Sequence, residues 1–291
     1  MKKLIQIKCP HTGAMLLLCA VTVLFGCDLQ SYSSPQGYEI EKGEERLLGK
    51  SLNEISGITY NIEDSSLLAI SDSKKKVFEI SLKKQKLKDY TADVVPPDQD
   101  LEDIVKVNSS VYILSSKGLI YEVPAKASDT TGLRSYPFWA TNPNDFETMY
   151  YDAGVNSLII LCKNCASDKG YQMRSAYRFD LQTKTFDTAV FYSISTTEVK
   201  KLLKNDDAKF DPSAAAIHPV NKRLYILSSA GNLLVITDTR GKPIEAFNLN
   251  PDKHPQAEGI AFAPDGEMYI TNEGRHGKPT LQIFKYKIVN K

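Results

Sequence analysis

A short signature returns five times along the chain, and each copy leads into a run of strand-forming residues. Aligned on their third residue, the copies follow one another at steps of 46, 45, 66 and 45 residues. Repeats of this length built from short strands are typical of radial β-architectures, in which each repeat is one four-stranded blade. The sequence therefore predicts an all-β propeller. The copies occupy residues 54–58, 100–104, 145–149, 211–215 and 256–260, with Ser56, Glu102, Glu147, Ser213 and Glu258 in third place.

The residues after each signature predict the remaining strands of a blade. Aliphatic and aromatic runs bounded by turn residues are typical of buried strands, and they occur at residues 67–71, 111–115, 158–162, 224–228 and 268–271. Third strands follow in all five repeats, but fourth strands are clear only near residues 88–92 and 244–249. The last repeat lacks its outer strand, so we expect residues 38–48 to supply it and close the ring. The alternative is that residues 38–48 are a lead-in without a partner.

The step from Glu147 to Ser213 is longer than the others and predicts an insertion. Residues 196–205 match a short capped helix with Val199, Leu202 and Leu203 on its apolar side. Read as an insertion, this segment leaves five blades. Six blades would result if it concealed degenerate strands.

The first 26 residues have the features of a targeting segment. Three lysines precede an apolar run at residues 14–25, which is shorter than the ~20 residues that span a bilayer. The run ends in LFGC, which resembles the lipobox of bacterial lipoproteins and implies cleavage before Cys27 and acylation of that cysteine. An ordinary secretory signal with an incidental cysteine is the alternative.

The remaining chain divides into a polar tether, residues 27–36, and a single domain, residues 37–291. Removal of the leader takes away three lysines and no acidic residue, so the formal net charge changes from +1 to about −2. A chain without a basic excess is not expected to bind nucleic acid. We expect the protein in the bacterial cell envelope, anchored by lipid to the outer membrane and facing the periplasm rather than the cell surface.

The sequence of the repeats resembles that of the SdiA-regulated (YjiK-like) β-propeller family of bacterial envelope proteins. The clearest segments are ISGITY at residues 55–60, DLEDI at 100–104 and QAEGIA at 256–261. The resemblance covers nearly the whole mature chain. It implies a fold related to the NHL, SMP-30-like and phytase-esterase-like propellers.

Acidic residues hold the first or third position of every signature. Residues two apart share one face of a strand, and the opening strand of a blade lines the central channel, so these carboxylates are expected to crowd the axis. Like charges so close must be protonated, hydrated or shared with a cation, and a hard divalent ion suits several oxygen ligands. We predict Ca²⁺, or less favourably Mg²⁺, held by Glu102, Glu147 and Glu258 with Asp100 and Asp145 as outer ligands. The alternative is that these acids cap turns and water fills the channel.

A second ring of polar residues follows the second strands. The ends of these strands should lie near one face of the disc, where loops on a rigid scaffold bind ligands. Lys163 could hold an anionic group there, or it could be a solvated charge or an ion-pair partner. The candidate ligand-binding residues are Asp72, Lys163, Asn272 and Glu273, with Ser116 and Ser229 in the same ring.

Cys162 and Cys165 are the cysteines left after the leader and Cys27 are set aside. A zinc site would need a second ligand pair, and a thioredoxin-like motif would need a βαβ context. A disulfide that closes a tight loop outside the cytoplasm is the favoured interpretation, and two free thiols are the alternative. Nucleophile-elbow, phosphate-loop and HExxH motifs are absent from the sequence.

Three functions remain open at this stage. The first is a binding module that presents one face to a small molecule, glycan or envelope protein. The second is a hydrolase in which channel Ca²⁺ polarises a lactone carbonyl or a phosphoester. The third is a structural partner within an envelope complex.

Overall fold

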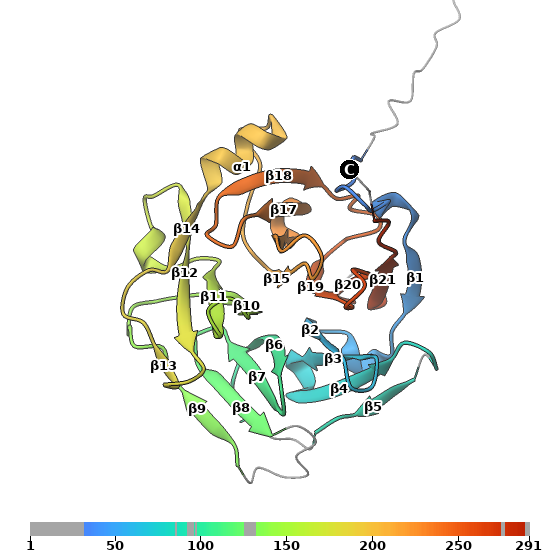
Figure 1. Cartoon of the computed structure of the whole chain (residues 1–291), viewed down its shortest axis with the longest axis horizontal. Coiled ribbons are helices and arrows are strands. Elements are labelled where there is room, and N and C mark those ends of the chain that lie inside the picture. Colours follow the sequence, from blue (N-terminus) through green and yellow to red (C-terminus); the bar gives the residue numbers. More distant parts are fainter. Residues whose placement is uncertain are drawn as a thin grey trace, which may run out of the picture. The chain divides into compact units, whose positions relative to one another are not determined.

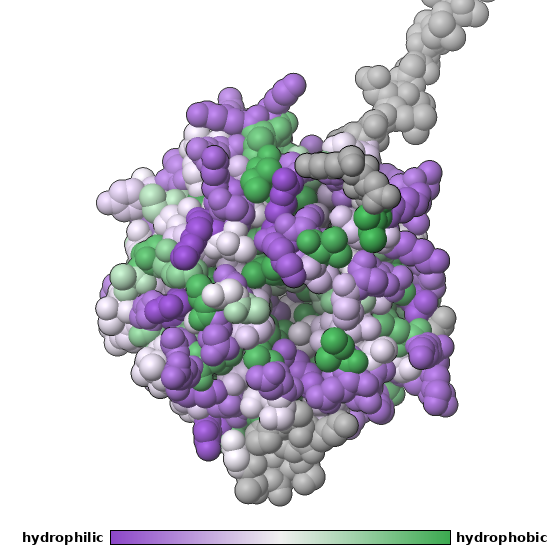
Figure 2. Space-filling model, viewed as in Figure 1, coloured by the Kyte–Doolittle hydropathy of each residue, from purple (hydrophilic) through white to green (hydrophobic). Residues whose placement is uncertain are grey.

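The computed structural model describes residues 32–84, 86–91, 96, 98–124, 132–274 and 277–288. These residues form five antiparallel sheets arranged around a common centre (Figure 1). The innermost strands contact one another in a closed ring, β2 to β6 to β10 to β15 to β19 and back to β2. The predicted five-bladed β-propeller is therefore confirmed. Figure 2 shows the same face hollowed at its centre, with hydrophobic side chains beside the hollow and hydrophilic ones toward the rim.

In blades one to four the strands follow chain order from the channel outward. Blade one holds β2 (Ile55–Asn61), β3 (Ser66–Ser71), β4 (Lys76–Ser81) and β5 (Leu87–Asp89). Blade two holds β6 (Leu101–Val107), β7 (Ser110–Ser115), β8 (Ile120–Pro124) and β9 (Arg134–Tyr136). Blade three holds β10 (Phe146–Asp152), β11 (Ser157–Cys162) and β12 (Met173–Asp180), with β13 (Thr185–Phe186) and β14 (Tyr192–Ser195) both paired to β12. Blade four holds β15 (Ala214–Ile217), β16 (Leu224–Ser228), β17 (Leu233–Thr237) and β18 (Pro243–Asn248).

Blade five joins the two ends of the domain. It consists of β19 (Ala257–Phe262), β20 (Met268–Asn272), β21 (Thr280–Phe284) and the N-terminal β1 (Glu44–Leu47). The register of β1 runs from Glu44 opposite Ile283 to Leu47 opposite Thr280. The expected ring closure by the N-terminal segment is confirmed, and it covers the edge that β21 would otherwise expose.

Tyr38 fastens this closure from a position just before β1. Its hydroxyl donates to the Gly266 carbonyl at 2.6 Å and lies 2.7 Å from His218 Nε2. The His218 Nδ1 atom accepts the N–H groups of Val220 and Asn221, both at 3.1 Å, so Nε2 carries the proton and donates to Tyr38. One side chain thus connects the turns of blades four and five.

The insertion in the long repeat is β14 followed by the helix α1 (Thr196–Leu203). Ser195 caps the helix by accepting the Glu198 N–H. The helix ends at Leu203, two residues before the predicted end, and Lys204 follows with a left-handed φ of 52°. Val199 is fully buried, as expected, but Leu202 is 41% exposed and does not belong to the apolar side. None of the described helices has the length and apolar character needed to cross a bilayer.

The hydrophobic core lies between neighbouring blades. Each adjacent pair of blades shares one cluster of buried side chains, such as Leu67 and Ala69 of blade one against Ala261 and Tyr269 of blade five. A central strand is covered on both faces by this arrangement, which is why β3, β11 and β16 read as continuous apolar runs. Short 3-10 helices lie in the connecting segments at Ile40–Lys42, Lys50–Leu52, Asp72–Lys74, Ala166–Asp168 and Ser229–Gly231.

Candidate functional site

A β-bulge places the third signature residue in four of the five blades. The pairing of the two inner strands shifts between Ile55 and Gly57, and the same shift recurs at Glu102, Glu147 and Glu258. A bulge leaves one residue without an opposite partner and re-aims its side chain. Regular alternation was expected from the first signature position, but the strands of these four blades begin at the second. The orientation of the three glutamate side chains is therefore determined by bulges rather than by strand periodicity.

Backbone hydrogen bonds bring the first signature position next to the second polar ring. The N–H groups of Asp72, Ser116 and Lys163 donate to the carbonyls of Glu54, Asp100 and Asp145 at 2.9, 3.0 and 2.9 Å. The Glu273 N–H donates in the same way to Gln256 at 3.0 Å. Both rings thus lie at one end of the channel, which we call the acidic mouth: Asp72, Asp100, Glu102, Asp145, Glu147, Lys163, Glu258 and Glu273.

Glu102 and Glu258 are the most perturbed members of the acidic mouth. Burial, reinforced by the charges of Glu147, Asp100, Asp145 and Asp72, raises the pKa of Glu102 to about 9. Burial, with Glu147 and Glu273 nearby, raises the pKa of Glu258 to about 8. Both carboxyl groups therefore hold their protons at neutral pH when no cation is present.

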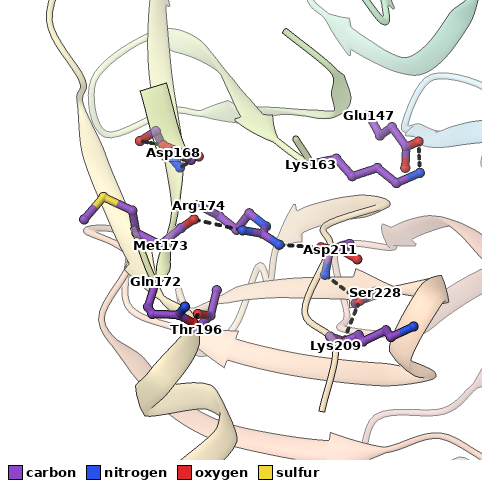
Figure 3. A network of polar contacts seen from close by, with 11 residues as sticks. Glu147, Lys163, Asp168, Gln172, Met173, Arg174, Thr196, Lys209, Asp211 and Ser228 are labelled. Atoms are coloured by element: carbon purple, nitrogen blue, oxygen red, sulfur yellow. Dashed lines mark hydrogen bonds and ion pairs between the residues drawn. The ribbon is translucent and has the colours of Figure 1, made fainter. Parts of the chain in front are cut away.

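Lys163 supplies a cation at the mouth. Its ammonium donates to a Glu147 carboxylate oxygen (Figure 3). Burial lowers the pKa of Lys163, but the hydrogen bond to Glu147 and the charges of Glu147, Asp145 and Glu258 outweigh it, so this pKa is raised. Burial still leaves the pKa of Glu147 above its usual value.

The disulfide between Cys162 and Cys165 closes the loop that carries Lys163. Both cysteines are buried, and their Cα atoms lie 5.6 Å apart. The Lys163 and Asn164 N–H groups both donate to the Asp145 carbonyl, at 2.9 and 3.2 Å. The loop is thus held covalently and by the backbone of the neighbouring signature, which fixes where the Lys163 ammonium can reach.

The fourth signature is neutralised by an arginine from the preceding blade. Arg174 Nη2 lies 2.5 Å from Asp211 Oδ1, and the Asp211 N–H donates to Ser228 Oγ at 2.9 Å (Figure 3). This signature carries Ser213 rather than glutamate in third place. Blade four therefore contributes no free carboxylate to the mouth.

Two predicted ligand-binding residues are engaged within the fold. An Asp72 carboxylate oxygen accepts the Leu101 N–H at 2.8 Å and also the Lys75 ammonium. Asn272 lies inside β20, fully buried, where its amide donates to Thr280 Oγ1 at 3.0 Å. Glu273, one residue later, occupies the ring position equivalent to Asp72 and Lys163.

Asp103 is a carboxylate that sequence reasoning did not select. It is buried, and its two oxygens accept the N–H groups of Ile104 at 2.8 Å and of Met149 in the next blade at 2.7 Å. Burial raises its pKa well above the usual value, against the effect of the two N–H donors. A Cβ at Gly57 would collide with this carboxylate and would lie 2.9 Å from the Asp103 Cα. The signal in the sequence was an acid at the fourth signature position of this one copy, where the other copies have Gly57, Thr148, Ala214 and Gly259.

The oxygen donors of the acidic mouth are chemically suited to a hard cation such as Ca²⁺. Across the described residues, no three His, Cys, Asp or Glu side chains form a group that could hold a metal ion as they stand. Side-chain rearrangement, with displacement of Lys163 from Glu147, would be needed to gather the glutamates. Cys27 and the leader lie outside the described residues.

Several solved structures share this fold at low sequence identity. A luciferin-regenerating enzyme superposes with a TM-score of 0.53 at 12% identity, over 84% of this chain and 95% of that one. Glutaminyl cyclase from Myxococcus xanthus gives 0.53 at 11% identity, over 85% and 96%. The calcium-binding protein regucalcin from Agrobacterium tumefaciens gives 0.50 at 11% identity, over 84% and 96%. At such identities the likeness establishes the fold alone.

The family is established by the sequence itself. No curated protein matches the chain. The family model described as SdiA-regulated matches residues 31–275, which is most of the chain, and the protein therefore belongs to the SdiA-regulated family.

Proposed function

We propose that the protein is a binding module of the bacterial cell envelope that takes a divalent cation, Ca²⁺ before Mg²⁺, at the acidic mouth. The observation that carries the proposal is the convergence of desolvated carboxyl groups, with the pKa of Glu102 raised to about 9 and that of Glu258 to about 8. Groups in such a setting resist ionisation because each new charge meets others in a poorly hydrated place. A bound cation removes this penalty.

The proposed site has a defined chemistry. Glu102, Glu147 and Glu258 provide hard oxygen ligands, with Asp100 and Asp145 outside them, and Ca²⁺ accepts six to eight such ligands in flexible geometry. Mg²⁺ requires a tighter octahedron and is therefore less suited to carboxylates that must move together. Because Glu102 and Glu258 are protonated at neutral pH, cation binding must release protons, and affinity should rise with pH.

Calorimetric titration of the detergent-solubilised full chain with Ca²⁺ tests this function. We expect one site per chain, stronger binding at pH 8 than at pH 6, and proton release that is seen when buffers of different ionisation enthalpy are compared. Glu102→Gln and Glu258→Gln should each weaken binding by about tenfold or more. Glu44→Gln is the matched control, since Glu44 lies exposed on the outermost strand of blade five. Binding that is absent at every pH, or that is unaffected by both mouth variants, would refute the proposal.

Envelope anchoring is the second part of the proposal, and it rests on Cys27. Labelled palmitate should enter the wild-type chain and not Cys27→Ala, and the wild-type chain should fractionate with the outer membrane. Incorporation into Cys27→Ala would contradict acylation at this residue. The same preparation, offered lactones and phosphoesters with and without Ca²⁺, distinguishes a binding module from a hydrolase: cation-dependent turnover would assign the enzymatic function instead.

A further inference from the structure

The channel has a pocket at the end opposite the acidic mouth. A pocket of about 180 Å³ is lined by residues from the later part of all five innermost strands, together with Pro219. The acidic mouth lies where the same strands begin, and the two sets share no residue. An apolar cavity of about 150 Å³ suffices to hold benzene. The pocket is therefore large enough for one ring, or a short branched chain, with a small substituent.

Lys106 is the one charged residue among the described residues that line this pocket. Its side chain is only 5% exposed, and its ammonium donates to Glu63 Oε1 at 2.9 Å. The Glu63 side chain is 53% exposed, so water screens its charge and the pair contributes little. An ammonium has three donors, and a buried one favours partners for all of them. The wall of the pocket thus carries a positive charge that one solvent-exposed carboxylate, Glu63, neutralises only in part.

Thr59 provides a second polar group beside Lys106. The Thr59 hydroxyl oxygen lies 3.4 Å from the Lys106 backbone nitrogen, whose N–H it accepts, and its own proton remains available for donation. The rest of the lining is mainly aliphatic or aromatic, including Met149, Ile260 and Phe262. A concave wall that combines apolar side chains with a few polar groups is the usual form of a small-molecule site.

We propose that this pocket binds a small organic anion, in which a carboxylate meets Lys106 and Thr59 and an aromatic or branched apolar body lies against Tyr60 and Ala216, which line the pocket and are only partly buried. The charge of Lys106 selects the anion, and the volume limits the body to about one ring. The site is independent of the cation proposed at the acidic mouth.

Benzoate is the probe, and benzyl alcohol is its neutral counterpart. Calorimetric titration of the full chain in detergent should give a dissociation constant of about 1 mM for benzoate and binding weaker by about tenfold for benzyl alcohol. Lys106→Met should weaken benzoate binding by about tenfold and leave benzyl alcohol unchanged. Lys83→Met, on an exposed turn of blade one, is the matched control and should bind benzoate as the wild type does.

A second variant tests the location without touching the charge. Ala216→Leu extends a side chain that lines the pocket and should abolish binding of both probes, while the melting temperature confirms that the ring is folded. Equal affinity for benzoate and benzyl alcohol in the wild type would overturn the proposal even if Lys106→Met failed to fold. So would undiminished benzoate binding in folded Lys106→Met, or no binding of benzoate to the wild type at about 10 mM.

Discussion

Replacement of Glu102 by glutamine should flatten the pH dependence of stability. The pKa of Glu102 is raised in the folded protein to about 9 from its usual value of 4.5, chiefly by burial and then by the charge of Glu147. The folded state therefore keeps a proton that the unfolded state loses. For a carboxyl group shifted upward, the stabilisation is fully present below pH 4.5 and is lost as the pH rises toward 9.

The size of the effect follows from proton linkage. Within that window one extra proton in the folded state lowers the free energy of unfolding by about 1.4 kcal/mol for each pH unit. Between pH 6.5 and pH 8, Glu102 should thus cost the wild type about 2 kcal/mol. Glu258 adds a similar slope until the pH approaches its own pKa of about 8. The buried His218 and His254, with pKa values lowered to about 4 by burial, contribute only below pH 6.5.

Urea unfolding between pH 6.5 and pH 8, in chelator, measures this slope. Glu102→Gln should lose about 2 kcal/mol less stability than the wild type over that interval, while Glu44→Gln should follow the wild type. Identical slopes for the wild type and Glu102→Gln would refute the electrostatic reasoning, because they would show that Glu102 ionises in the folded protein as it does in the unfolded chain.

Three further perturbations test the closure, the channel and the contact between blades. Tyr38→Phe leaves the His218 donor without its partner and should lower the free energy of unfolding by about 1–2 kcal/mol at pH 7.5, measured in urea. Because burial lowers the pKa of His218, the stability of the wild type should also fall as the pH drops from 6.5 toward 4, and a constant stability over that range would contradict a buried neutral histidine. Gly57→Ala drives a methyl group against Asp103 and should cost about 1–3 kcal/mol, so an unchanged melting temperature would show that the two strands separate freely. Hydrogen bonds from Lys184, Tyr136 and Tyr112 lower the pKa of Glu122 to about 2 despite its burial, and Glu122→Gln weakens them. This change should lower the free energy of unfolding by about 2–3 kcal/mol at pH 7 but by little at pH 2, and an equal loss at both pH values would count against an ionised Glu122.

Much of the fold could be predicted because it repeats and because its strands are locally encoded. Runs such as residues 224–228 are apolar up to a final serine, which is typical of a strand covered on both faces, and the structure places β16 there with every residue buried. The closure could be predicted as well, since the last repeat lacked an outer strand and residues 38–48 belonged to no repeat. The insertion at α1 was recognisable from its spacing, but the exposure of Leu202 depended on which side of the helix met β18 of blade four and β12 of blade three.

The candidate site was predicted less completely. The sequence identified Glu102, Glu147 and Glu258 as residues at one end of the channel, and backbone bonds hold each of their signatures beside the second polar ring at that end. The reason given was strand alternation, whereas the orientation comes from bulges, which a one-residue change in pairing creates. Lys163 was left between two interpretations, and the structure gives it Glu147 as an ion-pair partner. Asp103 was passed over because its partner, the Met149 N–H, belongs to another blade.

The sequence by itself determined the repeat, the strand order within each blade and the acidic character of one end of every inner strand, because these depend on residues close together in the chain. The tertiary structure alone decided which side chains share the channel: Lys163 with Glu147 at the acidic mouth, and Lys106 with Thr59 at the opposite pocket. Residues that are far apart in sequence, or that a bulge re-orients, form these sites. Their distances, burial and pKa values therefore arise only when the ring is closed.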